Sequence, residues 1–306
     1  MSPPRPDVDV VIATRDRPEL VRRAIRSVLE QDYEGRIQCT LVFDRSELDL
    51  SLVDPGERRS VQVVRNERTP GLAGARNTGI LQGRAPLVAF CDDDDEWLPQ
   101  KLTRQVTALD GHPSSVLACT GIEIVRDGVV TPRVLERRTV GLDELIRSRV
   151  TELHPSTFLL RRNALAGELG LVQESVPHGY GEDYDLLLRA ASIGPVISVP
   201  QVLARIHWHP DSYFAHKWEP MADGLSWLLE HHPELGNDRK GWARVAGQVA
   251  FARAAHGRRS LGSAWALRTL RRDPAQARGW LALAVAARIL PPDRVMRTLN
   301  ARGRGI

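Results

Sequence analysis

The 306-residue sequence contains no uninterrupted apolar stretch of about eighteen residues, the minimum for a transmembrane helix. Its first residues, Met-Ser-Pro-Pro-Arg-Pro, lack the apolar core of a secretory signal peptide. Three cysteines occur, Cys39, Cys91 and Cys119, and their wide spacing fits neither a disulfide framework nor a cysteine-based zinc site. We therefore expect a cytoplasmic protein whose cysteines are small buried hydrophobic residues.

Charge is unevenly distributed along the chain. Residues 239–306 contain fifteen Lys or Arg and two Asp, a net charge of +13, whereas the whole chain has +4, so residues 1–238 carry −9. A chain of this length can bury a full core, and typical domain sizes predict one large domain with a smaller addition. We expect a catalytic domain over residues 1–218 and a basic helical region over residues 219–306.

The first half of the chain alternates apolar β-branched segments with segments of helical periodicity. Strands are predicted over four segments, residues 8–13, 39–43, 61–65 and 87–91. A helix is predicted after the first strand, and another over residues 75–82. This alternation indicates an α/β protein with a mostly parallel sheet and helices on both faces.

The second half is predicted to be mixed and then helical. Strands are predicted over residues 116–125, 156–160, 196–199 and 202–206. Residues 181–191 have the pattern of a helix with acidic residues in its first turn. From Met221 onward, proline and glycine interrupt a helical pattern, which predicts three or four short helices.

Polar residues follow several predicted strands at the point where each strand ends. Thr14 to Arg17 follow the first strand, Asp44 the second, and the run Asp92-Asp93-Asp94-Asp95 the fourth. Ligands of such sheets bind beyond the carboxyl ends of the strands, so these residues are expected to share one cleft. Four adjacent carboxylates repel one another, and Mn²⁺ or Mg²⁺ bridging two phosphates would offset that repulsion. The alternative is a polar segment that begins a helix.

These segments, in this order, resemble family 2 glycosyltransferases of the GT-A fold. The resemblance is carried by Ala-Thr-Arg-Asp-Arg-Pro, Asp44, Gly71-x-x-Gly-Ala-Arg-Asn-x-Gly79, Phe90-Cys-Asp-Asp-Asp-Asp-Glu-Trp-Leu-Pro99 and Gly181-Glu-Asp-Tyr-Asp-Leu186. It covers residues 7–215. It implies an inverting enzyme that moves a sugar from a nucleoside-diphosphate sugar to an acceptor hydroxyl with the help of a divalent metal ion.

The resemblance also implies roles for individual residues. Donor binding falls to Ala13, Thr14, Arg15, Arg17, Asp44, Arg76, Asn77, Asp92 and Asp93. Asp94 would bind the metal directly, and His207 or His209 would complete its coordination. Asp183 would be the general base that deprotonates the acceptor, although an acidic residue that only stabilises a helix N-terminus is the alternative.

Acceptor binding is predicted for Trp97, His154 and Glu182, with Trp97 either stacking on a sugar ring or anchoring a helix. The sequence departs from the family pattern at Ala13, at Arg15 and before Asp44. The base and sugar of the donor are therefore left open, as is the acceptor, which could be a glycan, a lipid-linked sugar or a small molecule.

Two other classes of protein compete with this interpretation. A sugar nucleotidyltransferase would require a glycine-rich phosphate loop, but residues 13–16 contain no glycine. A protein that binds a nucleotide sugar or an acidic partner without turnover is the second alternative. The basic helices lack a nucleic-acid-binding motif, so no nucleic-acid partner is expected. They could instead contact the inner face of the membrane or a second copy of the chain.

Overall fold

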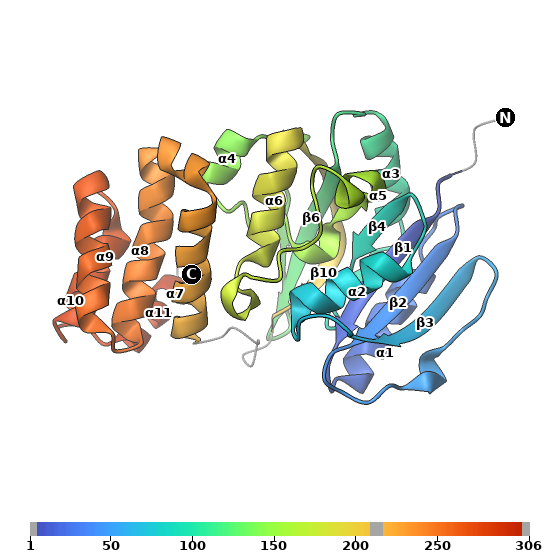
Figure 1. Cartoon of the computed structure of the whole chain (residues 1–306), viewed down its shortest axis with the longest axis horizontal. Coiled ribbons are helices and arrows are strands. Elements are labelled where there is room, and N and C mark those ends of the chain that lie inside the picture. The colour runs from blue at the N-terminus through green and yellow to red at the C-terminus, as the bar shows by residue number, and fades with distance from the viewer. Residues whose placement is uncertain (1–4, 209–216, 302–306) are drawn as a thin grey trace. The chain divides into compact units, whose positions relative to one another are not determined.

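The computed structural model of the protein describes residues 5–208 and 217–301 (Figure 1). The chain divides into two compact units. Unit 1 comprises the described residues within Met1–Leu145, Val150–Glu174 and Asp183–Pro210. Unit 2 comprises those within Ile146–Arg149, Ser175–Glu182 and Asp211–Ile306. The boundary predicted between residues 218 and 219 stays a prediction.

Unit 1 is an α/β domain built on one large sheet. Its described strands are β1 (Val8–Thr14), β2 (Ile37–Phe43), β3 (Arg59–Arg65), β4 (Leu87–Phe90), β5 (Glu96–Trp97), β6 (Leu117–Arg126), β7 (Val129–Arg133), β8 (Thr139–Val140), β9 (Leu159–Arg161) and β10 (Val196–His207). The order along the sheet is β3-β2-β1-β4-β9-β6-β10-β5, with β7 beside β6 and β8 beside β10. The neighbours β3, β2, β1 and β4 are parallel, as are β6 and β10. The prediction of a mostly parallel sheet is confirmed.

Helices cover both faces of this sheet. The helices and helical turns used below are α1 (Pro18–Leu29), α2 (Leu72–Gln82), α3 (Lys101–Asp110), α4 (Leu142–Arg147), η2 (Pro155–Thr157), α5 (Arg162–Ala166) and α6 (Glu182–Ile193). Because side chains alternate along a strand, Val10 and Ile12 of β1 belong to the core shared with α1 and α3, whereas Val11 faces Gly79 of α2. Figure 1 accordingly shows α2 on one side of β1 and β2 and α1 on the other.

Two glycines permit the tight loop that precedes α2. Gly71 has φ = 121°, a conformation that other residues rarely adopt. A Cβ atom on Gly74 would lie 1.9 Å from the carbonyl oxygen of Thr69, so only glycine fits the close approach of the two backbones. The beginning of α2 is thereby held beside the carboxyl ends of β1 and β2.

The ends of some elements differ from the predictions. Residues 196–206 form one long strand instead of two, because pairing with β6 resumes after a register shift between Val199 and Val202. The segment at residues 156–160 begins as the helical turn η2 and becomes β9 only at Leu159. In both places, pairing with a neighbouring strand, β6 for β10 and β4 and β6 for β9, decides where the strand begins and ends.

Unit 2 is helical. Its described helices are α7 (Trp218–His231), α8 (Arg239–Ala255), α9 (Arg259–Arg272), α10 (Ala277–Ala286) and α11 (Pro292–Ala301), which is five, so the expectation of three or four was too low. The breaks fall at the predicted prolines and glycine. Ala250 and Phe251 of α8 and Ala266 of α9 are buried in a core shared with Ala282 of α10. Within residues 5–208 and 217–301, no helix combines the length and apolarity needed to cross a bilayer.

A buried lysine makes the stability of unit 1 dependent on pH. Lys101 is fully buried at the start of α3, its Nζ lies 3.7 Å from the centre of the Trp97 ring, and burial lowers its pKa to about 7. Between pH 7 and the ordinary lysine value of 10.5, the unfolded chain binds a proton that the folded chain does not. The free energy of unfolding should therefore rise with pH across this window, by at most about 1.4 kcal/mol per pH unit.

We expect Lys101→Met to raise the free energy of unfolding at pH 7 by roughly 2 kcal/mol or more, because the variant never charges a buried group. The gain over the wild type should shrink as the pH rises towards 10. Urea denaturation at several pH values measures both effects, with the exposed Lys240→Met as control. Parallel pH profiles for the wild type and Lys101→Met would contradict the burial of an uncharged lysine.

Candidate active site and metal centre

The four adjacent aspartates form a turn directly after β4. The backbone N–H of Asp95 donates to the carbonyl oxygen of Asp92 at 3.2 Å, which reverses the chain. The side chains alternate in exposure, 25% for Asp92, 9% for Asp93, 27% for Asp94 and 2% for Asp95. Asp92 and Asp94 are therefore partly exposed, whereas the side chains of Asp93 and Asp95 are directed into the protein.

The ends of β1 and β2 meet this turn. The Thr14 hydroxyl donates to Asp93 at 2.8 Å, and the backbone N–H of Asp44 donates to the carbonyl oxygen of Thr14 at 3.0 Å. Arg17 contacts both Asp93 and Asp94 through Nη1, at 3.1 and 3.0 Å. The prediction that the polar strand ends come together is confirmed for these residues.

Burial of so many carboxylates raises their pKa values. Burial raises the pKa of Asp93 to about 6, even though the Thr14 hydroxyl and Arg17 favour its charged form. Burial and the charge of Asp92 raise the pKa of Asp94 as well. Burial, Asp92 and Asp94 together raise the pKa of Asp95 well above its ordinary value. The charged forms of these carboxylates are therefore disfavoured in the turn, and a bound cation would stabilise them.

Asp92, Asp95 and His154 form a cluster suited to a divalent cation. One ligand atom from each lies within 4.8 Å of the others. Ser156 of η2 orients the cluster, because its hydroxyl donates to Asp95 at 2.5 Å and accepts from the backbone N–H of Asp92 at 3.1 Å. Nδ1 of His154 lies 3.6 Å from Asp95 Oδ2. Two carboxylates and an imidazole fit Mn²⁺ or Mg²⁺, so the side chains present suit the predicted ion.

This cluster differs from the ligand set predicted from the sequence. Asp94 is paired with Arg17 and is not a member. The side chain of His207 contacts Glu96, with Nε2 2.6 Å from the carboxylate. The backbone N–H of His207 contacts the cluster, donating to Asp95 at 3.2 Å. His209 lies outside the described residues. None of the three members was assigned to the metal from the sequence: Asp92 was predicted to bind the donor and His154 the acceptor, and Asp95 was noted only as part of the aspartate run.

The two donor-binding candidates on α2 have different environments. Arg76 contacts Asp92 at 2.7 Å and lies 5.3 Å above the Phe90 ring, so its guanidinium belongs to the aspartate turn. Asn77 is buried, its amide donates to Val172 and Glu174, and its oxygen accepts the backbone N–H of Val172. The polar atoms of Asn77 are thus bound within the protein, and donor binding by Asn77 stays a prediction.

Glu174 is a structural residue of the site that sequence reasoning missed. Its carboxylate accepts from Asn77 at 2.7 Å and from Arg68 at 2.5 Å, and the backbone N–H of Thr69 lies at 3.3 Å. Burial opposes its charge, but these hydrogen bonds outweigh it and lower the pKa of Glu174 to about 2. Glu174 therefore holds the loop that precedes α2. A single glutamate about a hundred residues away offers no sequence signal for this contact.

Two acceptor candidates are buried. Trp97 is 3% exposed, its indole N–H donates to the carbonyl oxygen of Ser156 at 2.7 Å, and its ring packs on Lys101. Glu182, at the first position of α6, is 2% exposed. Both side chains are therefore buried, and acceptor binding by Trp97 and Glu182 stays a prediction.

The remaining candidates keep accessible or partly accessible positions. Asp183 is half-buried in the first turn of α6, where Oδ1 accepts the backbone N–H of Tyr184 at 2.7 Å. Asp44 accepts from Asn66 at 2.8 Å. Arg15 is exposed and pairs with Asp16 at 3.6 Å, and Ala13 is half-buried near the end of β1.

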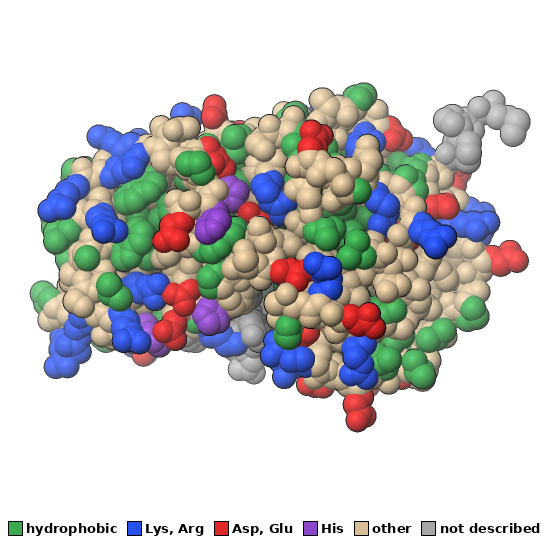
Figure 2. Space-filling view, viewed as in Figure 1, with side chains coloured by type: hydrophobic (Ala, Val, Ile, Leu, Met, Phe, Trp, Pro, Cys, Tyr) green, Lys and Arg blue, Asp and Glu red, His purple; other side chains and the backbone are tan. Residues whose placement is uncertain are grey.

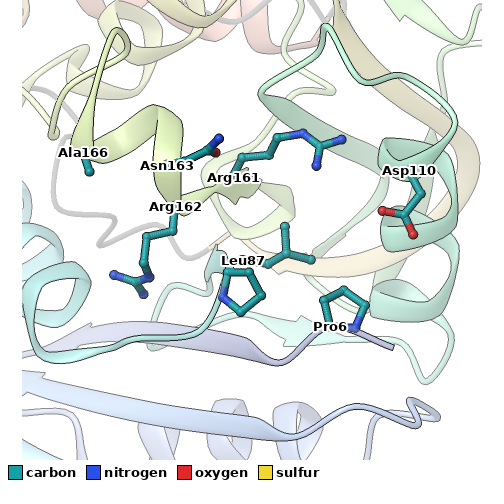
Figure 3. A pocket seen from close by; sticks show the side chains of 8 residues that line it. Pro6, Leu87, Asp110, Arg161, Arg162, Asn163 and Ala166 are labelled. Carbon is teal, nitrogen blue, oxygen red and sulfur yellow. The ribbon is translucent and has the colours of Figure 1, made fainter. Parts of the chain in front are cut away.

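A hollow on the opposite edge of the sheet does not belong to this site (Figure 3). Pro6 and Pro86, which precede β1 and β4, line it together with Arg161 and Arg162. Arg162 donates to Asp9 at 2.6 Å and to two backbone carbonyls, and Arg161 donates to two other carbonyls. These guanidinium groups are held by hydrogen bonds within the protein and stabilise the fold.

A mostly parallel α/β sheet with an acidic turn beyond the ends of its strands is typical of enzymes that bind a nucleotide at this edge. The model of the family "Glycosyl transferase family 2" matches residues 9–167, more than half of the chain, and the chain belongs to this family. It is a glycosyltransferase that uses a nucleotide sugar.

The relatives and structures similar to this chain agree with that assignment. The amylovoran biosynthesis glycosyltransferase AmsB of Erwinia amylovora is 29% identical over 74% of this chain and 78% of its own. The UDP-Glc:alpha-D-GlcNAc-diphosphoundecaprenol beta-1,3-glucosyltransferase WfaP of Escherichia coli is 23% identical over 61% of this chain and 71% of its own. The mannosyltransferase PcManGT of Pyrobaculum calidifontis, solved with GDP-Man and Mn²⁺, has a TM-score of 0.55 at 16% identity and covers 97% of this chain and 84% of its own. The structural similarity supports the GT-A fold.

Proposed function

We propose that this chain transfers a sugar from a nucleoside-diphosphate sugar to a hydroxyl of a lipid-diphosphate-linked sugar, with inversion at the anomeric carbon. The observation that carries the proposal is the Asp92, Asp95 and His154 cluster beside Thr14 and Arg17, at the carboxyl edge of the sheet. The lipid-linked acceptor is supported by the name of WfaP, whose acceptor is a diphosphoundecaprenol-linked sugar.

Asp92, Asp95 and His154 would hold Mn²⁺ or Mg²⁺. When bound, the ion supplies positive charge that stabilises the leaving nucleoside diphosphate. Asp94, which the family resemblance assigns to the ion, is adjacent to this set and stays a candidate ligand. Arg17 and Arg76, both in contact with the aspartate turn, would bind the diphosphate of the donor. Thr14 and Asp44 would bind its nucleoside.

Asp183 would act as the general base. In a single displacement, its carboxylate accepts the proton of the acceptor hydroxyl while that oxygen forms a bond to the anomeric carbon. The bond between the anomeric carbon and the β-phosphate oxygen breaks, and the nucleoside diphosphate leaves with the electron pair. Inversion follows because the acceptor attacks the face opposite the leaving group.

The basic C-terminal helices would place this reaction at the cytoplasmic face of an anionic membrane, where a lipid-linked acceptor is available. In this assignment, residues 1–218 carry catalysis and residues 219–306 locate the enzyme.

A screen of nucleoside diphosphates tests the donor and the metal together. We expect one of UDP, GDP or dTDP to raise the melting temperature in the presence of Mn²⁺, by roughly 5 °C at a hundredfold excess over its Kd. The shift should disappear in EDTA, because the diphosphate is held largely through the ion. A donor sugar with the selected base should then be consumed only when Mn²⁺ or Mg²⁺ is present. An equal shift in EDTA would contradict the metal assignment.

A further inference from the structure

The outer faces of α9 and α10 form a distinctive surface of unit 2. Both helices pack on α8, since Gly262 of α9 contacts Ala254 and Gly247 of α8 contacts Arg278 of α10. The positions on the other side of the two helices are exposed. They include Leu261 at 50%, Leu267 at 48% and Trp280 at 57%. Large apolar side chains are therefore presented to solvent on helices that already have a packed inner face.

The charged residues of this surface have one sign. Arg268 and Arg271 are exposed on the same side of α9, and Arg268 lies 5.4 Å above the Trp265 ring. From Arg259 to Ala286 the only acidic residue is Asp273, which is buried. The part of unit 2 that carries α9 and α10 shows basic and hydrophobic side chains close together in Figure 2. We call Leu261, Leu267, Arg268, Arg271 and Trp280 the α9–α10 surface.

Trp280 is fixed in an orientation suited to an interface. Its indole N–H donates to the carbonyl oxygen of Pro274 at 2.9 Å, so its polar atom is satisfied within the protein while much of the ring stays exposed. Tryptophan is enriched in the zone between lipid head groups and acyl chains, where its large ring lies at the interface.

We propose that the α9–α10 surface binds the head-group region of an anionic lipid bilayer. Arginines would pair with lipid phosphates, and Leu261, Leu267 and Trp280 would enter the interface without crossing the membrane. The inference deepens the proposed function and rests on the part of it that places the enzyme at an anionic membrane. It names the residues that make this contact.

Charge complementarity favours a bilayer over the other occupants. A symmetric contact between two copies would bring Arg268 and Arg271 close to the same residues of the second copy, with no exposed acidic residue between Arg259 and Ala286 to offset the repulsion. A nucleic acid would use the arginines but leave the exposed leucines in water. An anionic bilayer accommodates both the positive charge and the apolar side chains.

Vesicle flotation of the full-length chain tests the proposal. We expect binding to vesicles of phosphatidylcholine with phosphatidylglycerol, weak binding to phosphatidylcholine alone, and loss of binding at high salt. Arg268→Gln/Arg271→Gln should weaken binding roughly thirtyfold, since each arginine contributes about 1 kcal/mol near an anionic surface. Trp280→Ser should weaken it independently of salt. Arg26→Gln/Arg36→Gln, which removes the same charge from exposed positions of unit 1, is the matched control and should bind like the wild type.

Turnover with a water-soluble acceptor separates this inference from the proposed chemistry. The Arg268→Gln/Arg271→Gln variant should keep that turnover and lose it only with acceptor in anionic vesicles. Circular dichroism confirms that each variant is folded. The inference is overturned if the wild type does not bind anionic vesicles, if neutral vesicles bind equally, if the control variant loses as much affinity, or if RNA displaces the vesicles. An absence of turnover with normal vesicle binding would count against the proposed function alone.

Discussion

Replacing Asp183 with asparagine should lower turnover by roughly a thousandfold while leaving nucleotide affinity almost unchanged. The asparagine keeps the size of the side chain and can still accept a hydrogen bond from the backbone N–H of Tyr184, which Asp183 accepts at 2.7 Å. It cannot accept the proton of an acceptor hydroxyl. Initial rates with saturating donor, and nucleotide affinity by calorimetry, measure the two quantities separately.

The matched control for this variant is Asp143→Asn. Asp143 is an exposed acidic residue in the first turn of α4, so the substitution removes an acid from an equivalent helical position. It should change turnover less than twofold, since a surface charge at a helix N-terminus contributes under about 1 kcal/mol to stability only. If Asp183→Asn behaves like Asp143→Asn, the acidic residue only stabilises its helix and the base lies elsewhere.

Asp92→Asn should lower turnover by about a hundredfold or more and raise the Mn²⁺ concentration needed for half-maximal activity by at least about tenfold. Asp92 belongs to the candidate cation cluster and also contacts Arg76 at 2.7 Å, so in the proposed function its charge serves both the ion and the donor side of the site. High Mn²⁺ should restore part of the activity. Titration of activity with Mn²⁺ measures this shift.

Two controls accompany the Asp92 variant. Asp127→Asn removes an exposed carboxylate in the turn between β6 and β7 and should leave the Mn²⁺ titration unchanged. Because Arg76 is buried, the melting temperature of Asp92→Asn must be compared with that of the wild type. Treatment of the wild type with EDTA followed by added Mn²⁺ gives the same comparison without a mutation. A wild-type Mn²⁺ titration for Asp92→Asn would show that the ion is held by other residues.

The alternating exposure of the aspartate turn explains why a run of four acids is useful. Asp93 and Asp95 point inward and are tied to Thr14 and Ser156, whereas Asp92 and Asp94 are accessible. The inward carboxylates hold the turn against β1 and η2. Asp95 also belongs to the candidate cation cluster with Asp92 and His154, and the accessible carboxylates beside it can contact a bound ligand.

Local patterns were sufficient to predict the α/β class and the position of the aspartate turn. Over residues 8–91, apolar strand-like segments alternate with segments of helical periodicity. Polar residues follow several of the apolar segments, at the strand ends where a parallel sheet binds its ligands. Prolines and Gly257 also located the breaks between the C-terminal helices. The order of weak motifs along the chain was specific enough to indicate family 2 glycosyltransferases, which the family model confirms.

Tertiary structure alone decided which side chains face the ligand. Asp95 and His154 approach each other although they are 59 positions apart in the sequence, and the Asn77 amide donates to Val172 and Glu174. Trp97, which was predicted either to stack on a sugar ring or to anchor a helix, is buried with Lys101 against its ring. The sequence by itself determined the elements, the charge asymmetry and the family, because these depend on local periodicity and composition. The membership of the candidate cation cluster depends on distances between atoms from separate segments, which only the packed sheet sets.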